Sequence, residues 1–141
     1  MDSNKLTRFL EAQNQVYLKA LSEIKKGQKE THWMWFVFPQ LKGLGLSKTS
    51  VFYGINDLNE AQRYLSHPVL GKHLIEISTA LSALKDKTAT AVFGSPDNLK
   101  LHSSMTLFAA VPNANPVFAQ VLDTYFDGVP DNRTLELLQK K

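Results

Sequence analysis

Polar residues that interrupt apolar stretches need either a hydrogen-bonding partner or a functional reason. Gln13 falls three residues after Leu10 and four before Tyr17, inside an apolar stripe. A buried amide without a partner costs about 1–3 kcal/mol. Gln13 is therefore expected either to hydrogen-bond a neighbouring backbone group or to face a ligand at the mouth of a pocket.

A second group of residues that could do chemistry lies in the aromatic run from His32 to Gln40. If this run is helical, His32 and Trp35 share one face. A histidine beside an indole can act as a general base or stack on an aromatic ligand. The alternative is that the aromatic side chains are core and that His32 caps the segment.

A third group follows a proline at position 96. On a helix that starts there, Lys100 lies one turn after Asp97 and one turn before Ser103 and Ser104. This spacing suits an anion site or a Ser–Lys nucleophile pair. It equally suits a surface ion pair between Asp97 and Lys100, worth about 0.2–0.5 kcal/mol, with small serines between packed helices.

Together these groups define one site hypothesis, in which the polar residues line a single cleft. His32 is the candidate for proton transfer, because the ordinary pKa of histidine lies closest to neutrality. The candidate ligand-binding residues are Gln13, Trp35, Gln40, Tyr53, Lys100 and Ser103. Tyr53, which precedes a glycine, would place a phenol over the pocket or simply end a helix.

Several signatures of known chemistry are absent from the sequence. The chain has no cysteine, which excludes disulfides, thiolate nucleophiles and cysteine-bound zinc. It has no Walker-type phosphate loop and no GxGxxG, HExxH or GxSxG motif. None of the four histidines forms a close helical ligand pair with another. We therefore expect no metal site and no cofactor.

The charge of the chain does not favour nucleic acid as a partner. The net charge is +3, but the basic residues are scattered, whereas a phosphate backbone needs a denser stripe.

The longest apolar run, residues 33–39, is far shorter than the about 20 residues of a membrane span. The N-terminal residues lack the apolar region of a signal peptide. These features predict a cytoplasmic protein, and they leave its oligomeric state open.

The first segment of the chain shows the clearest helical pattern. Apolar residues from Leu6 to Ile24 recur at spacings of three and four, which places them on one face of a helix. Lys25 and Lys26 suit the negative end of the helix dipole, and Gly27 can adopt the left-handed conformation that ends a helix. The pattern predicts a single helix that stops at Gly27.

The aromatic run from Trp33 to Phe38 suits either a buried strand or a short helix. No second strand of comparable quality exists to pair with it, and a lone strand leaves its backbone groups unsatisfied. We predict a short buried helix that ends at Pro39.

Prolines mark further helix starts. Pro68, Pro96 and Pro116 each stand where a first helical turn tolerates proline. Ser95 and Asn115, which precede the last two, suit the cap position. Three further helices are therefore expected.

The remaining signals complete an all-α reading. Asp57 with Glu60 resembles a capping box, in which Glu60 reaches back to the cap residue. A last short helix starts at Asp131. We predict one compact domain, residues 1–141, of about six or seven short helices packed orthogonally. Its predicted core comprises Phe9, Val16, Trp35, Phe38, Leu74, Ile77, Leu81, Met105, Phe108, Phe118 and Leu122.

The sequence also resembles a known family. The similar segments are RFLEAQ (8–13), HWMWFVFPQ (32–40), YGI (53–55), HPVLG (67–71), FGSPDNLK (93–100) and SSMTLF (103–108). They resemble the uncharacterised family numbered 1810 among the domains of unknown function, and the resemblance extends over essentially the whole chain. It implies a compact, mainly helical bacterial protein without an established reaction or ligand.

Some members of that family carry the label calpastatin, which does not suit this chain. Calpastatin is a long, largely disordered inhibitor, whereas this sequence has the apolar content and the helix start and stop signals of a folded domain. The preferred hypothesis is a protein that binds or processes a polar small molecule, such as a nucleotide derivative. The alternative is a non-catalytic protein-interaction module that docks through a helix face, including Leu135 and Leu138.

Overall fold

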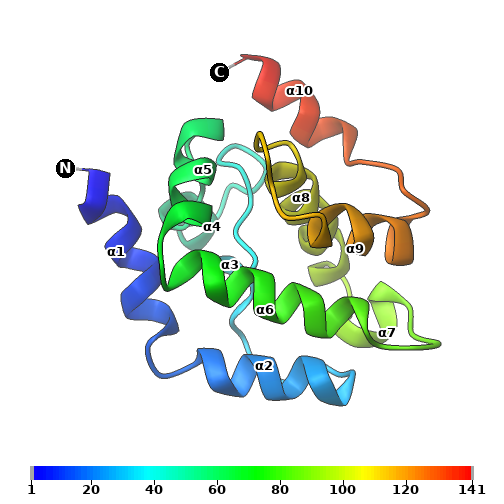
Figure 1. Ribbon diagram of the computed structural model, residues 1–141. Coiled ribbons are helices and arrows are strands. Elements are labelled where there is room, and N and C mark those ends of the chain that lie inside the picture. Colours follow the sequence, from blue (N-terminus) through cyan, green and yellow to red (C-terminus); the bar gives the residue numbers. More distant parts are fainter. Residues whose placement is uncertain (1, 141) are drawn as a thin grey trace.

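The computed structural model describes the backbone of residues 2–140 and the side chains of residues 6–140. Ten helices lie within residues 2–140, and no strand does; only an isolated parallel bridge joins Leu41 to Ile55. In chain order they are α1 (Asp2–Gln13), α2 (Tyr17–Lys26), α3 (Met34–Val37), α4 (Lys48–Phe52), α5 (Leu58–Ser66), α6 (Leu70–Ser82), α7 (Ala89–Phe93), α8 (Asp97–Ala109), α9 (Val117–Phe126) and α10 (Asn132–Lys140) (Figure 1).

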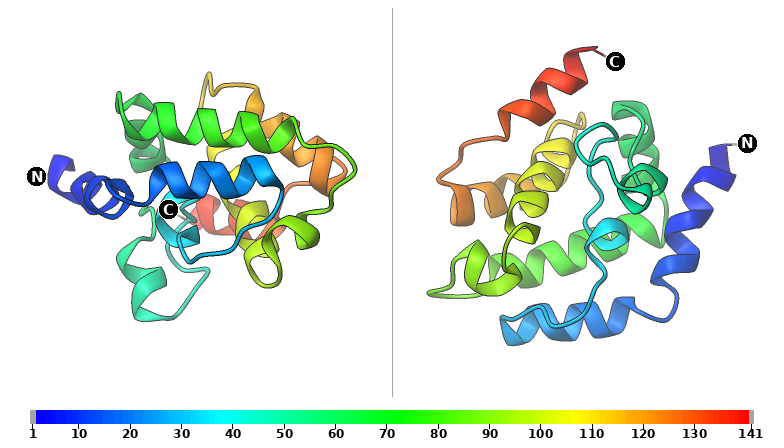
Figure 2. Two further views of the ribbon diagram at one scale, coloured as in Figure 1. Left: turned by 90° about the horizontal axis from the view of Figure 1, so that it is seen from below. Right: turned by 180° about the vertical axis from the view of Figure 1, so that it is seen from behind.

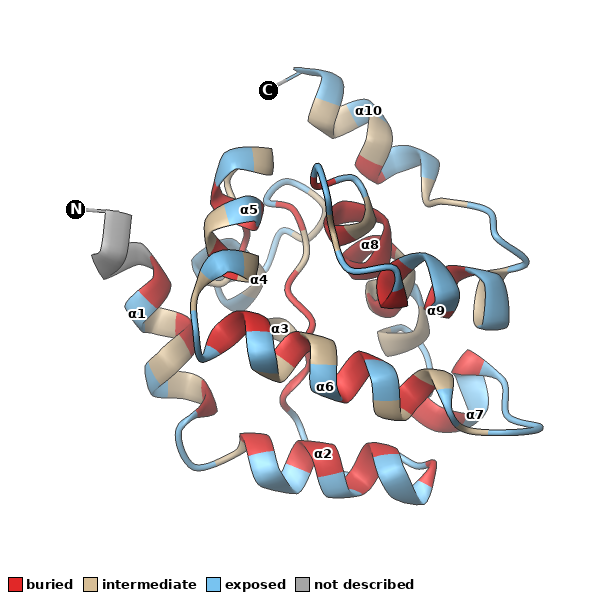
Figure 3. Cartoon of the chain, viewed as in Figure 1, coloured by how far each residue is buried: buried red, intermediate tan, exposed pale blue. Residues whose placement is uncertain are grey.

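Two long helices organise the fold. α6 packs against α2, α5 and α9, and α8 packs against α5, α7, α9 and α10. α2 and α6 lie side by side with nearly parallel axes, whereas α8 crosses behind α6 steeply (Figure 2). α8 is buried almost all round, from Leu101 to Phe108, while α2 and α6 bury one face each (Figure 3). The predicted all-α class is confirmed.

The number of helices is higher than the six or seven predicted, for a local reason. α4 and α7 have five residues each, too few for an apolar period to show. Both begin with a hydroxyl cap: Ser47 accepts from the Ser50 N–H at 3.1 Å, and Thr88 accepts from the Ala91 N–H at 3.0 Å. A cap without an apolar period was not enough to predict either helix from the sequence.

The prediction of a single helix from Leu6 to Ile24 is wrong. The chain turns at residues 14–16, between α1 and α2, and the Val16 N–H bonds the Gln13 carbonyl at 3.1 Å. The turn directs α1 away from α2, so Gln13 ends one helix and Tyr17 begins the next. Gly27 ends α2 in the left-handed conformation, as predicted, with φ 82°.

The prolines precede their helices rather than open them, since α6, α8 and α9 begin at Leu70, Asp97 and Val117. Asn115 Oδ1 accepts from the Val117 N–H at 2.9 Å, so Asn115 supplies an acceptor at the start of α9, although Pro116 occupies the cap position predicted for it. The prediction that Ser95 caps α8 is wrong, because no side chain caps that helix.

The predicted core is confirmed except at two positions. Val16 and Trp35 are half-buried, and the other nine predicted residues are buried. The fully buried tryptophan is Trp33, which precedes the short predicted helix α3. Trp33 stands just before this single helical turn and Trp35 lies on it, so the two side chains face different surroundings.

A buried carboxylate, Glu23 of α2, holds the segment before α3. Its oxygens accept from the Glu30 N–H at 2.8 Å, the Thr31 N–H at 3.0 Å and the Trp33 indole Nε1 at 2.9 Å. The Thr31 hydroxyl donates to it at 2.7 Å. Burial alone would raise the pKa of Glu23, but these hydrogen bonds outweigh it and lower the pKa to about 2. Glu23 is therefore ionised in the folded protein and structural.

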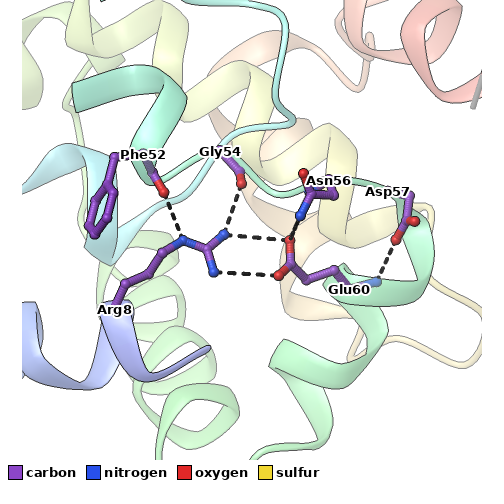
Figure 4. A network of polar contacts seen from close by, with 6 residues as sticks. All are labelled: Arg8, Phe52, Gly54, Asn56, Asp57 and Glu60. Atoms are coloured by element: carbon purple, nitrogen blue, oxygen red, sulfur yellow. Dashed lines mark hydrogen bonds and ion pairs between the residues drawn. The ribbon is translucent and has the colours of Figure 1, made fainter. Parts of the chain in front are cut away.

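A second polar network ties α1 to α5 (Figure 4). Arg8 donates to the carbonyls of Phe52 and Gly54, at 2.8 and 2.9 Å, and pairs with Glu60 at 3.4 Å. Asp57 caps α5 by accepting from the Glu60 N–H at 2.8 Å. Glu60 reaches back to the Asn56 N–H at 2.8 Å, one residue beyond the predicted partner Asp57. Because Glu60 is fully buried, the network is part of the fold's framework.

Candidate functional site

The structure does not gather the predicted site residues into one cleft. His32 and Trp35 line a small cleft beside the start of α8, and Lys100 lies over the Trp35 ring with Nζ 4.7 Å from its centre. Gln13 lines a different cleft, between the α1–α2 turn and α6. The prediction of a single shared cleft is therefore wrong.

The three remaining predicted residues lie outside both clefts. Ser103 is buried, and its single hydroxyl proton is shared between the Leu99 carbonyl at 3.1 Å and Asp131 at 3.2 Å. Tyr53 packs in an aromatic cluster with Phe9, Phe36 and Phe52. The backbone carbonyl of Gln40 accepts from the Ile55 N–H at 2.9 Å. A part in binding stays a prediction for all three.

Gln13 satisfies its buried amide completely. Its Nε2 donates to the Phe36 carbonyl at 2.6 Å and to the Tyr64 hydroxyl at 2.9 Å. Its Oε1 lies 2.8 Å from Nδ1 of His73, a residue of α6. Because a carbonyl can only accept, the Phe36 contact fixes which end of the amide faces His73.

That orientation also fixes the proton on His73. An amide oxygen can only accept, so His73 Nδ1 carries the proton and donates to Gln13. Nε2 of the neutral ring then keeps a free lone pair. It has no hydrogen-bond partner among the described residues and is not fully buried, and His73 lines the cleft. His73 therefore offers an accessible acceptor nitrogen on a residue that lines the cleft.

Tyr17 holds the His73 ring from the other side. The two rings stack with centres 3.6 Å apart and planes at 6°. The Tyr17 hydroxyl donates to Glu76 at 2.6 Å and contacts the His73 carbonyl oxygen at 3.0 Å. Burial, followed by the hydrogen bond to Glu76, raises the pKa of Tyr17, which stays a neutral phenol. The imidazole is thus held by one hydrogen bond and one ring face.

The surroundings keep His73 neutral. Burial lowers the pKa of His73 below its ordinary value of 6.5; Glu76 opposes this shift and Lys72 adds to it. A neutral, oriented imidazole with an open Nε2 can accept a hydrogen bond or a proton. A depressed pKa in a cleft is a physical mark of a functional site.

The cleft around His73 has the size and lining of a ligand site. Its volume is about 840 Å³, within the range of about 300–1,000 Å³ usual for ligand pockets. Apolar walls come from Leu10, Leu18 and Val69. The polar lining comes from Glu11, Asn14, Lys72 and Glu76. It therefore holds two carboxylates but one ammonium group. We call this hollow the α6 cleft.

Sequence reasoning missed His73, although a signal existed. His73 stands three residues after Leu70 and four before Ile77, so it interrupts the apolar stripe of α6 as Gln13 interrupts that of α1. Two polar residues in two apolar stripes can satisfy each other. Their 60-residue separation hid that pairing from any local pattern.

Neither a metal centre nor a membrane span is found in the described part of the chain. No three His, Asp or Glu side chains within residues 6–140 converge as metal ligands. Each described helix is too short or too polar to cross a bilayer.

Fold and cleft together define a small all-helical protein whose one-turn helices and loops pack around α6 and α8. The chain belongs to the family described as protein of unknown function (DUF1810), whose model matches residues 3–138. The resemblance seen in the sequence motifs is thus confirmed over nearly the full length.

A solved structure shares this fold. The crystal structure of the conserved hypothetical protein Rv1873 from Mycobacterium tuberculosis is similar, with a TM-score of 0.93 and 48% identity. The match covers 95% of this chain and 96% of that one. A comparison with curated proteins found no match.

Proposed function

We propose that this protein binds a small molecule in the α6 cleft, and that His73 Nε2 accepts a hydrogen bond from it. The observation that carries the proposal is the neutral imidazole of a residue that lines the cleft, oriented by Gln13 and Tyr17, with no protein partner for its Nε2 lone pair among the described residues. An oriented acceptor of this kind suits a hydrogen-bond donor of a ligand.

The lining of the α6 cleft favours a particular ligand class. His73 Nε2 and the carboxylates of Glu11 and Glu76 are acceptors, and Lys72 is the one cationic side chain among the lining residues. A ligand with N–H donors and an apolar or planar body complements such a site. A nucleoside-like molecule fits this description, with any phosphate placed toward Lys72 and away from the carboxylates.

The test is a thermal-shift panel of adenosine, cytidine, guanosine, NAD and ADP-ribose. A ligand at about 100 times its Kd stabilises by about 2.7 kcal/mol, which raises the melting temperature by several degrees. In His73→Asn the shift should fall to near zero, because the asparagine amide can still reach Gln13 but supplies no acceptor in place of Nε2. His32→Asn, the same change at an exposed histidine of the other cleft, should keep the wild-type shift.

Two results would contradict the proposal. One is a panel in which no compound shifts the wild-type melting temperature. The other is an equal shift in wild type and His73→Asn. Binding should also be constant between about pH 8 and 6.5 and weaken below, because a protonated Nε2 donates and no longer accepts.

A protein-interaction role is the second candidate, and one observation favours it. Leu18 and Val69 are 79% and 42% exposed, and both lie at the rim of the α6 cleft, where an apolar peptide side chain could bury them. The docking face predicted on α10 has less support, since Leu135 is half-buried and Leu138 packs against the core. Binding that needs Leu18 but not His73 would favour this second role.

A further inference from the structure

A second, smaller cleft lies between the segment before α3 and the start of α8. Its volume is about 270 Å³, and its lining includes Lys29, His32, Met34, Trp35, Ser95 and Asp97. None of these residues contributes to the α6 cleft. Its properties therefore need an explanation of their own.

Two lysines share one carboxylate at this cleft. Lys29 Nζ lies 2.9 Å from Asp97 Oδ2, and Lys100 Nζ lies 3.5 Å from Asp97 Oδ1. The three groups sum to a charge of +1. The predicted ion pair of Asp97 with Lys100 is thus present, but Asp97 also pairs with Lys29.

The Lys29 ammonium is short of acceptors. Its side chain is only 6% exposed, so water reaches it poorly. An ammonium group has three N–H donors, and within residues 6–140 the one anion near it is Asp97. A nearly buried cation with spare donors is stabilised by a further anion.

Each of the two lysines lies over an indole ring, and one of these rings, that of Trp35, lines the cleft. Lys29 Nζ lies 5.2 Å from the Trp33 ring centre, and Lys100 Nζ lies 4.7 Å from the Trp35 ring centre. Cation–π contacts of this kind attract an ammonium to the ring face without satisfying its N–H donors. Trp33 is fully buried, while Trp35 is half-buried and lines the cleft.

We propose that this cleft binds the phosphate group of a phosphate monoester. The phosphate oxygens would take up the spare donors of Lys29 and Lys100, and His32 at the rim can supply another. The exposed part of the Trp35 ring would contact the group esterified to the phosphate. The small volume suits a phosphate with a compact substituent. This inference does not depend on the function proposed for the α6 cleft.

The test follows the Trp35 indole N–H by NMR while inorganic phosphate or phenyl phosphate is added, with ionic strength held constant by sodium chloride. Saturable shifts are expected with both probes, and phenyl phosphate should bind more tightly. Lys100→Met should weaken binding at least tenfold, since it removes a cation and keeps the apolar stem. Lys26→Met is the matched control; that lysine is 63% exposed, pairs with Glu30, and should leave the affinity unchanged.

Asp97→Asn gives a test of opposite sign. Removing the competing carboxylate raises the local charge from +1 to +2 and frees both lysines, so phosphate should bind several-fold more tightly. Shifts that never saturate in the wild type would overturn the proposal. Equal affinity in wild type and Lys100→Met would also overturn it, as would weaker binding in an Asp97→Asn variant that keeps its circular dichroism and melting temperature.

Discussion

Trp33→Ala should lower the free energy of unfolding by about 3–5 kcal/mol, a large part of the stability of a typical domain. Trp33 is fully buried, packs near the rings of Phe38 and Phe93, and donates its indole N–H to Glu23. The substitution leaves a cavity and takes one donor from a buried carboxylate. Chemical denaturation followed by far-UV circular dichroism measures the loss.

Trp35→Ala is the matched control, because it makes the same change two residues away. Trp35 is half-buried and contacts Lys100, so its removal should cost about 1 kcal/mol or less. Equal losses in the two variants would contradict the different burial of the two tryptophans.

Glu23→Gln should cost about 3 kcal/mol at neutral pH. The pKa of Glu23 is about 2 in the folded protein against an ordinary 4.5, and each pKa unit corresponds to about 1.4 kcal/mol. The glutamine keeps the size but not the charge that accepts hydrogen bonds from Glu30, Thr31 and Trp33.

The pH dependence of the stability follows from the direction in which folding shifts the pKa of Glu23. Because folding lowers the pKa of Glu23, its stabilisation is complete above about pH 4.5 and is lost as the pH falls toward 2. The wild type should therefore lose stability over this range more steeply than Glu23→Gln. Glu30→Gln, at a side chain that is 54% exposed, should behave like the wild type. Parallel pH profiles for wild type and Glu23→Gln would contradict the role given to Glu23.

Prolines and apolar stripes made much of the fold predictable. The helices containing Leu74, Met105 and Phe118 were all expected, since a proline stands just before each of them. The break at residues 14–16 was not expected, because Val16 and Tyr17 continue the spacing of the stripe across the turn. The direction that a chain takes after a turn depends on what α1 and α2 pack against, which local spacing does not encode.

In the aromatic run, the helix could be predicted from the sequence, but the burial of its individual side chains could not. A short buried helix was predicted there, and α3 is indeed helical from Met34 to Val37. Which tryptophan is buried depends on the partner of its indole N–H. That partner, Glu23, lies ten residues earlier on α2, and it was not singled out from the sequence. Charged residues are seldom fully buried unless paired, so composition favours the wrong assignment for Glu23.

The candidate site was also predictable only in part. Gln13 was singled out as a polar residue in an apolar stripe, with either a structural hydrogen bond or a ligand contact as its role. It is a structural amide, and the group that it orients lies in the proposed ligand cleft. His73 escaped notice because its partner is remote in sequence and its own helix is otherwise a regular apolar pattern.

The measurement that decides most directly whether the α6 cleft holds a poised histidine is the pair of ring ¹⁵N chemical shifts of His73, followed against pH. We expect a neutral ring at pH 7 with the proton on Nδ1 and a bare Nε2, which gains a proton only below the ordinary pKa of 6.5. Gln13→Leu should abolish the preference for the Nδ1 proton, because the acceptor that holds it is gone. A ring protonated at Nε2, or one that titrates above 6.5 in the wild type, would contradict the proposed acceptor and with it the site.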